Sequence, residues 1–374
     1  MKLTIERSQF LKSLSHAQSV VERANTIPIL GNVMLEAADG RLRLSATDLE
    51  LGAVETVDAE AVSGGGTTLS AQVLYDITRK LPDGAQVELE TEDGTDRIRL
   101  RCGRSTFTLS ALPPDEFPQL SKAEFACRFQ LAADDLRGLI DRTGFAASTE
   151  ETRYYLNGIY LHTTEHEGVP VLRAVATDGH RLARVEVPRP AGAEDMPGGV
   201  IVPRKAVQEL RKLLEGEDDD VSVALSETGI RFVIGSVELT SKLIDGTYPD
   251  YERVIPTGND KRLEVESRVL AEAVDRVTAI SSERTRAIKL AVDTASLQLT
   301  AADPTHGTAT EEIDVRFDGT APMEIGFNAR YLLEILRRIE GGTVALELAD
   351  PAAPTLVRDM VDSSALYVLM PMRV

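Results

Sequence analysis

The chain has 374 residues, of which 43% are apolar and 27% charged, a composition typical of a globular protein with several buried cores. Its net charge of −19 excludes a protein that coats nucleic acid or an acidic membrane with its whole surface, although one basic face remains compatible with it. We find no run of 18 apolar residues and no secretory signal, so we expect a cytoplasmic protein without membrane contact.

Three kinds of segment recur in the same order along the chain, which indicates an internal repeat. They are a strand that leads into a helix, starting at Leu3, Phe129 and Leu263; a strand that ends at Asp48, Asp178 and Asp303; and a second strand–helix unit over 69–81, 201–214 and 325–339. Because all three sets stay in register, three copies of one domain explain them better than chance does.

Apolar residues at helical spacing predict two helices in each copy. The six predicted helices cover 6–24, 71–81, 132–147, 204–215, 266–280 and 328–340. Alternating apolar residues on both sides of Gly103-Arg104 and of Gly235-Ser236 predict β-hairpins. We therefore predict an α+β fold in which two helices of each repeat pack on antiparallel sheets.

The predicted domains cover 1–122, 128–255 and 256–374. Segments 113–122 and 245–260 are rich in Pro, Gly and Asp and are predicted to be linkers.

Positive charge gathers on the predicted helices. They carry 16 Lys and Arg against 13 Asp and Glu, a net of +3, while the rest of the chain has a net charge of −22. The clearest basic faces contain Arg204, Lys205, Arg211 and Lys212 on one helix and Arg330, Arg337 and Arg338 on another. One such helix is usually a solvated face, but equivalent helices in each repeat could share one surface. Lys and Arg on such a surface would attract phosphates without reading bases.

Few residues suggest catalysis or metal binding. Asp178 and His180 form a possible acid–base pair, but no nucleophile in a glycine-rich elbow accompanies them. Cys102 and Cys127 are too few for a cysteine zinc site and are predicted to be buried thiols. The five histidines lack metal-ligand spacing, and we expect neither a metal nor a cofactor.

Seven segments, spread in order over the whole chain, resemble bacterial DNA polymerase III beta subunits, the replication sliding clamps. They are Thr26-Ile-Pro-Ile-Leu-Gly-Asn32, Arg153-Tyr-Tyr-Leu-Asn-Gly158, Ala176-Thr-Asp-Gly-His-Arg-Leu182, Ile201-Val-Pro-Arg-Lys205, Thr240-Ser-Lys-Leu243, Tyr248-Pro-Asp-Tyr251 and Val368-Leu-Met-Pro-Met-Arg-Val374. No single segment is specific, but their combination is.

The resemblance implies a non-catalytic processivity factor. Three equivalent domains would form a crescent, and two copies would close head to tail into a homodimeric ring around double-stranded DNA, bound without sequence specificity. Helices would line the hole and sheets would form the rim. The dimer contact would place Phe107 and Leu109 against Ala279 and Ile280 of the next copy.

The resemblance also implies partners and their pocket. A clamp loader would open the ring, and the replicative polymerase and the translesion and repair polymerases would bind through short linear motifs. The implied pocket residues are Leu156, Thr177, Gly179, His180, Arg181, Leu182, Pro249, Arg253, Val254, Val368, Met370, Pro371, Met372 and Arg373.

The DNA contacts implied by the resemblance include two adjacent tyrosines; a tyrosine ring suits stacking on an unpaired base, and the alternative is that one of the pair packs inward. The implied contacts are Arg153, Tyr154, Tyr155, Arg204, Lys205, Arg79 and Arg23, with Lys80 beside Arg79. The chain departs from the family at Ala24, where an arginine is common, and at Glu150, where a glutamine is.

Two other functional classes stay open at this point. One is a cytosolic hydrolase that uses Asp178 and His180, and the other is an acidic repeat scaffold that binds only proteins.

Overall fold

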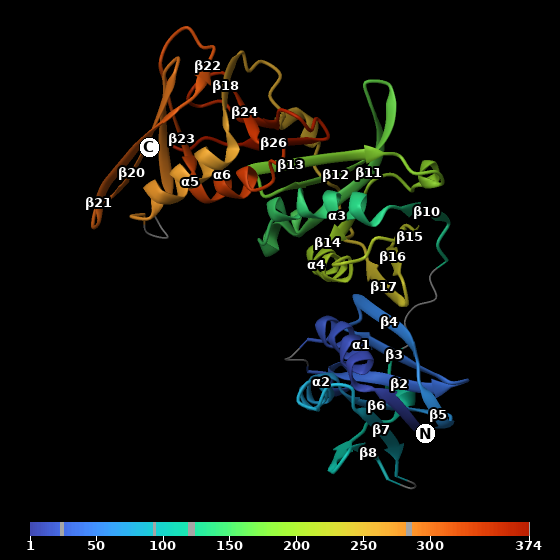
Figure 1. Cartoon of the computed structure of the whole chain (residues 1–374). Coiled ribbons are helices and arrows are strands. Elements are labelled where there is room, and N and C mark those ends of the chain that lie inside the picture. The colour runs from blue at the N-terminus through green and yellow to red at the C-terminus, as the bar shows by residue number, and fades with distance from the viewer. Residues whose placement is uncertain (23–25, 93–94, 119–123, 282–285, 374) are drawn as a thin grey trace. The chain divides into compact units, whose positions relative to one another are not determined.

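The computed structural model describes residues 1–22, 26–92, 95–118, 124–281 and 286–373 (Figure 1). Arg23 and Ala24 therefore lie outside the described residues. The chain divides into two compact units. Unit 1 holds Met1–Asp134, Pro190–Pro197 and Lys205–Leu243, and unit 2 holds Asp135–Arg189, Gly198–Arg204 and Ile244–Val374.

Within the described ranges, six α-helices form where the apolar periodicity predicted them, each shorter than predicted. They are α1 (Arg7–Val20), α2 (Ala71–Thr78), α3 (Ala133–Asp141), α4 (Arg204–Leu213), α5 (Ser267–Thr278) and α6 (Ala329–Leu336). The predicted ends are partly taken up by tighter turns: Lys80 donates its N–H to the carbonyl of Ile77, three residues back. Short 3₁₀ helices are η1 (Pro28–Gly31), η2 (Pro114–Glu116), η3 (Gly144–Ala146), η4 (Glu151–Leu156), η5 (Ala193–Asp195) and η6 (Tyr251–Val254).

Unit 1 contains two antiparallel sheets. The five-stranded sheet has, in spatial order, β5 (Glu60–Ser63), β1 (Lys2–Glu6), β7 (Gln86–Thr91), β8 (Arg97–Cys102) and β9 (Ser105–Ser110). The eight-stranded sheet has β10 (Cys127–Leu131), β15 (Val221–Leu225), β16 (Gly229–Ile234), β17 (Val237–Lys242), β4 (Leu51–Asp58), β3 (Arg41–Thr47), β2 (Asn32–Ala38) and β6 (Gly65–Ser70). Both predicted hairpins are confirmed, as β8–β9 and β16–β17.

Unit 2 contains the other two antiparallel sheets. The nine-stranded sheet has β14 (Val200–Pro203), β11 (Gly158–His166), β12 (Val169–Thr177), β13 (Arg181–Pro188), β26 (Ala365–Leu369), β25 (Thr355–Asp359), β24 (Thr343–Leu348), β18 (Lys261–Glu266) and β22 (Arg316–Phe317). The four-stranded sheet has β21 (Gly307–Asp314), β20 (Ser296–Asp303), β19 (Ala287–Val292) and β23 (Met323–Asn328).

Two of these sheets run across the predicted repeat boundaries. Strand β17 of the second repeat pairs with β4 of the first, with Leu239 opposite Ala53. Strand β26 of the third repeat pairs with β13 of the second, with Tyr367 opposite Ala183. The last strand of a repeat thus extends a sheet of the preceding repeat. The strands equivalent to these partners, β9 in the first repeat and β21 in the third, are sheet edges with a single neighbour each in the described chain.

Pairs of helices cover the sheets with apolar faces. Helix α1 packs on α2 and on β3 and β4, and it buries Phe10 and Leu14 (Figure 1). Helix α5 packs on α6 and on β20 and β21, and it buries Leu270 and Val274. Each such side chain contributes about 1.5–3 kcal/mol through burial, so these faces fix the helices on their sheets.

The segment 245–260 is more than the linker predicted from its composition. It contains η6, and the side chains of Tyr248 and Tyr251 are buried. Two large rings supply the apolar area that holds an otherwise polar segment on the protein. The prediction that Cys102 and Cys127 are buried is confirmed, and both are free thiols.

Candidate functional site

The turn between β12 and β13 carries several of the residues that the resemblance implied. The Asp178 carboxylate accepts the backbone N–H groups of His180 (2.9 Å) and Arg181 (3.1 Å). Gly179 has φ +87°, a conformation that glycine adopts without steric cost. The hydroxyl of Thr177 donates to the Arg181 carbonyl (2.7 Å). Local hydrogen bonds therefore fix this turn.

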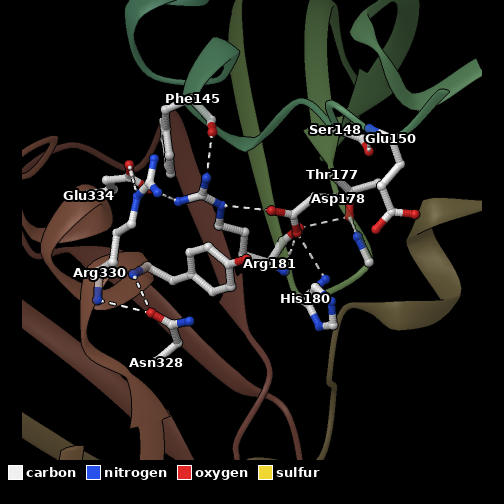
Figure 2. A network of polar contacts seen from close by, with 12 residues as sticks. Phe145, Ser148, Glu150, Thr177, Asp178, His180, Arg181, Asn328, Arg330 and Glu334 are labelled. Carbon is white, nitrogen blue, oxygen red and sulfur yellow. Dashed lines mark hydrogen bonds and ion pairs between the residues drawn. The ribbon is translucent and has the colours of Figure 1, made fainter. Parts of the chain in front are cut away.

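The Arg181 side chain, 7% exposed, joins this turn to η3 and α6 (Figure 2). Its guanidinium donates to the Asp178 carboxylate (3.1 Å), to the Phe145 carbonyl (2.7 Å) and to the Glu334 carboxylate. The Arg181 Cζ atom lies 4.3 Å from the ring centroid of Tyr331. The resemblance implied Arg181 as a residue of the partner pocket. In the structure its guanidinium already donates hydrogen bonds to acceptors of the protein itself.

The pair Asp178 and His180 lacks the geometry of a catalytic dyad. Asp178 accepts from backbone N–H groups and from Arg181, as a turn-stabilising aspartate does. The His180 imidazole stacks near Tyr331, with ring centroids 6.2 Å apart and an interplanar angle of 20°. Asp178 is thus engaged in the turn and does not orient the imidazole as a general base requires.

Apolar side chains from segments distant in sequence form one buried cluster beside this turn, here called the apolar floor. Leu156, Leu182 and Val368 belong to a single core cluster together with Tyr248 and Tyr251. Large apolar side chains nearby in sequence are exposed: Val254 by 50%, and Met370 and Met372 by 39% each. Exposed apolar groups near a buried apolar floor are typical of a protein-binding site.

The C-terminal segment is held at two points. The N–H of Met370 donates to the His180 carbonyl (2.9 Å), and the N–H of Met372 donates to the Gly326 carbonyl in β23 (2.8 Å). A cavity of about 970 Å³ opens beside it; its lining residues include Pro371, Met372, Arg373, Ala287, Thr300 and Gly326. The segment therefore spans from the β12–β13 turn to the four-stranded sheet.

Two predicted pocket residues lie on the surface near η6. The Arg253 side chain is 83% exposed and forms an ion pair with Asp250 (2.7 Å), while Pro249 is exposed. Both flank Tyr251, whose side chain is buried.

Of the predicted DNA contacts in η4, some are already engaged within the protein and would not be free to contact DNA. Arg153 forms a bidentate pair with Glu150, with distances of 2.8 and 2.9 Å. The hydrogen bond from Arg153 is the main cause that lowers the pKa of Glu150. Tyr154 is 53% exposed and meets Tyr155 edge to face, with centroids 5.7 Å apart, while Tyr155 packs on the apolar floor. Tyr154 is therefore the ring of this pair that is free to stack.

The other predicted DNA contacts lie on or after helices. Arg79 is exposed just after α2 and pairs with Asp76 (3.0 Å). Arg204 begins α4 and is half-buried. The Lys205 ammonium pairs with Asp48 and lies 3.5 Å from Glu22. A phosphate would compete with these carboxylates for Lys205.

The four residues implied at a dimer contact lie at two edges. Phe107 and Leu109 are half-buried on the edge strand β9. Ala279 is exposed and Ile280 is half-buried, directly after α5.

The residues of α6 that surround Arg181 were missed in the sequence. Asn328 accepts the N–H groups of Arg330 (3.0 Å) and Tyr331 (3.4 Å) as an N-cap, and Glu334 pairs with Arg330 four residues earlier (3.2 Å). An asparagine at a predicted helix start was a readable signal for the cap. No local sequence pattern indicated that Glu334 would contact Arg181.

Comparison with known proteins places the chain among DNA clamps. The models for the N-terminal, central and C-terminal domains of the DNA polymerase III beta subunit match residues 1–121, 130–250 and 252–373. The beta sliding clamps of Caulobacter vibrioides and Escherichia coli are 50% and 40% identical to this chain, each over the full length of both chains. A crystal structure of the Bartonella birtlesii sliding clamp bound to griselimycin is 49% identical over all of both chains, with a TM-score of 0.96.

The chain belongs to the DNA polymerase III beta subunit family. It is a DNA sliding clamp of three α+β clamp domains, the non-catalytic processivity subunit of DNA polymerase III, with DNA and polymerase as its partners. The hydrolase and scaffold alternatives are not favoured.

In the described parts of the chain, no helix is long and apolar enough to cross a membrane.

Proposed function

We propose that two copies of this chain close head to tail into a ring around double-stranded DNA. The observation that carries the proposal is the way sheets join within the chain. Strand β17 extends the sheet of β4, and β26 extends the sheet of β13. By the same repeat rule, β9 of one copy would pair with β21 of the next.

This pairing would cover the edges at β9 and β21. An unpaired edge strand exposes N–H and C=O groups that invite uncontrolled association. A head-to-tail contact that closes after two copies satisfies both edges without forming a filament. Phe107 and Leu109 on β9 and Ala279 and Ile280 after α5 would supply its apolar contacts.

The proposed DNA contacts are sequence-independent. Arg79, Arg153, Arg204 and Lys205 would meet phosphates, and Arg23 would join them. Tyr154, with Tyr155 behind it, would stack on an unpaired base. Because Glu150 and Asp48 already pair with Arg153 and Lys205, these contacts would be weak, as a sliding protein requires.

The proposed partner pocket lies on the apolar floor beside the β12–β13 turn. Its residues are Leu156, Thr177, Gly179, His180, Arg181, Leu182, Pro249, Arg253, Val254, Val368, Met370, Pro371, Met372 and Arg373. The replicative polymerase and the translesion and repair polymerases would insert short linear motifs there, and a clamp loader would use it while opening the ring. Flexible methionines suit a pocket that serves several partners.

Two further proposals concern the domain boundaries and the location in the cell. The domain boundaries are proposed at 1–122, 128–255 and 256–374, and the ring would act in the cytoplasm, where bacterial DNA is replicated.

Retention on circular DNA tests the ring directly. The clamp is loaded onto nicked circular DNA with its clamp loader and separated from free protein by gel filtration. We expect it to stay with the circle and to be lost once the circle is cut, because only topology holds it. Equal retention on linear DNA with free ends would show ordinary binding and overturn the proposal.

A further inference from the structure

A buried polar cluster joins strands β11, β12 and β13 to η6. The side chains of Arg173 and Glu186 are 4% and 5% exposed, and Arg173 Nε donates to Glu186 Oε1 at 2.6 Å. A second nitrogen of Arg173 donates to the hydroxyl of Tyr251 and to the carboxylate of Glu252, both at 2.8 Å. The Tyr251 hydroxyl also lies 2.9 Å from Nε2 of His162. The partner pocket as proposed does not include this cluster.

The chemistry of the groups gives this chain of hydrogen bonds a direction. Arginine can only donate, so the Tyr251 oxygen accepts from Arg173. The Tyr251 hydroxyl then donates a hydrogen bond to Nε2 of His162, and in this arrangement Nε2 carries no proton. The proton of the neutral imidazole sits on Nδ1, which faces the Thr163 carbonyl at 3.4 Å. Arg173, Tyr251 and His162 thus form a directed relay.

The surroundings of His162 favour its neutral form. Burial is the main cause that lowers the pKa of His162, and Arg173 on β12 lowers it further. The Thr163 carbonyl, Glu252 on η6 and Glu186 on β13 act in the opposite direction but do not outweigh these causes.

Other titratable groups complete the surroundings. On its own strand, Tyr160 stacks on His162 with centroids 4.8 Å apart, and Tyr248 stacks on Tyr160. Burial raises the pKa of Tyr251, which keeps its hydroxyl protonated. Further out, His166 and Arg184 both pair with Glu186.

Tyr251 connects this relay to the pocket. Its ring belongs to the same core cluster as Leu156, Leu182 and Val368, which form the apolar floor. It also begins η6, which ends at Val254 and follows Pro249 in the chain. One end of the side chain is therefore held by the relay, and the other packs beneath the proposed pocket.

We propose that Tyr251 is a positioning residue for the partner pocket: its hydrogen bonds to Arg173 and His162 hold η6 in place, and protonation of His162 releases it. Protonated His162 can only donate to the Tyr251 hydroxyl, so the hydroxyl hydrogen would lose the acceptor that Nε2 provided, and the positive charge of the imidazolium would face the Arg173 guanidinium. This inference rests on the proposed function of the pocket. It adds that acid weakens the binding of polymerases.

The test measures the affinity of the full-length clamp for the replicative polymerase of the same organism by surface plasmon resonance, between about pH 7.5 and pH 5.0, because the pKa of His162 lies below that of an ordinary histidine. We expect Tyr251→Phe to weaken binding about fivefold or more at neutral pH. We expect wild-type binding to weaken about fivefold in acid. His162→Gln keeps an acceptor for Tyr251 and cannot be protonated, so it should bind normally at neutral pH and lose the acid effect.

His166→Gln and His16→Gln are the matched controls, since His166 lies outside the relay and His16 lies on α1, outside both the relay and the proposed pocket; both should keep the acid effect. A purely structural role of Tyr251 would not remove the acid effect in His162→Gln. The inference is overturned if Tyr251→Phe binds like the wild type, if His162→Gln keeps the acid effect, or if His16→Gln alone abolishes it. If a chain lacking 370–374 binds as tightly as the wild type, the pocket itself is wrong, and the inference falls with it.

Discussion

At the scale of single residues, the chain uses buried arginines to join segments that are distant in sequence. Arg181 connects a turn of the second repeat to α6, and Arg173 connects β12 to η6. A planar guanidinium can donate to several acceptors at once, which suits such a junction. Its removal takes a charged partner away from carboxylates in a poorly solvated place.

We predict that Arg181→Ala lowers the stability of the clamp by about 3 kcal/mol, because Asp178 and Glu334 lose their shared partner. The loss appears as a lower midpoint of urea unfolding. The control is Arg330→Ala, which removes another partner of Glu334 whose side chain is 59% exposed. It should cost at most about 1 kcal/mol. Equal effects of the two variants would contradict the structural role of Arg181.

The tertiary partners of these buried arginines could not be predicted from the sequence. The family resemblance implied a site at Thr177–Leu182, but Glu334, a partner of Arg181, lies 153 positions away, beyond the range of any local spacing rule. His162, Arg173 and Glu186 sit on strands and were not singled out in the sequence, yet the last two are buried as a pair. Burial of charge depends on tertiary pairing, which no local pattern encodes.

At the scale of elements, the C-terminal segment after β26 has little structure of its own. Two backbone hydrogen bonds, to His180 and to Gly326, hold it between the β12–β13 turn and β23. Its methionines are exposed, so they add little to the core. Such a segment can be altered for binding without loss of the fold.

We predict that Met370→Ala with Met372→Ala weakens polymerase binding more than about tenfold and leaves the dimer intact, because the exposed thioethers serve partners. Surface plasmon resonance and light scattering measure the two quantities. Val361→Ala is the control, since it removes an apolar side chain that is 77% exposed elsewhere in the third repeat. Loss of the dimer in the double variant would show that the segment is structural.

Helices and hairpins were predictable because their signals are local. Apolar spacing located six helices, and Gly103 and Gly235 located two hairpin turns. The pairing of β17 with β4 was not predictable, since the two strands lie far apart in sequence and belong to different repeats. The burial of the tyrosines in 245–260 was not predicted for a related reason. The composition of this segment indicated a linker, and the burial depends on tertiary packing.

At the scale of the whole molecule, the open edges β9 and β21 are where we expect a second copy to bind. The helices of each repeat bury their apolar faces within the chain, whereas Phe107 and Leu109 on β9 remain half-buried. Apolar residues on an edge strand are tolerated only if a partner covers them.

We predict that Leu109→Asp converts the dimer to a monomer, because a charge would have to be buried in the apolar contact. Light scattering should show a fall from twice 40.6 kDa to 40.6 kDa. Val62→Asp is the control: this residue is 74% exposed on β5, the opposite edge of the same sheet, and should leave the mass unchanged. A dimeric Leu109→Asp variant would place the contact elsewhere.

The sheets that cross repeat boundaries also affect how the protein is made. Strand β4 ends at Asp58, but its neighbour β17 begins at Val237, so the ribosome must add well over a hundred residues before the two can meet. At bacterial rates of synthesis the nascent strand waits on the order of ten seconds. During that time it is a target for chaperones and a starting point for misassembly. The shared sheets that hold the mature chain together thus make its biosynthesis depend on protection of an unfinished N-terminal half.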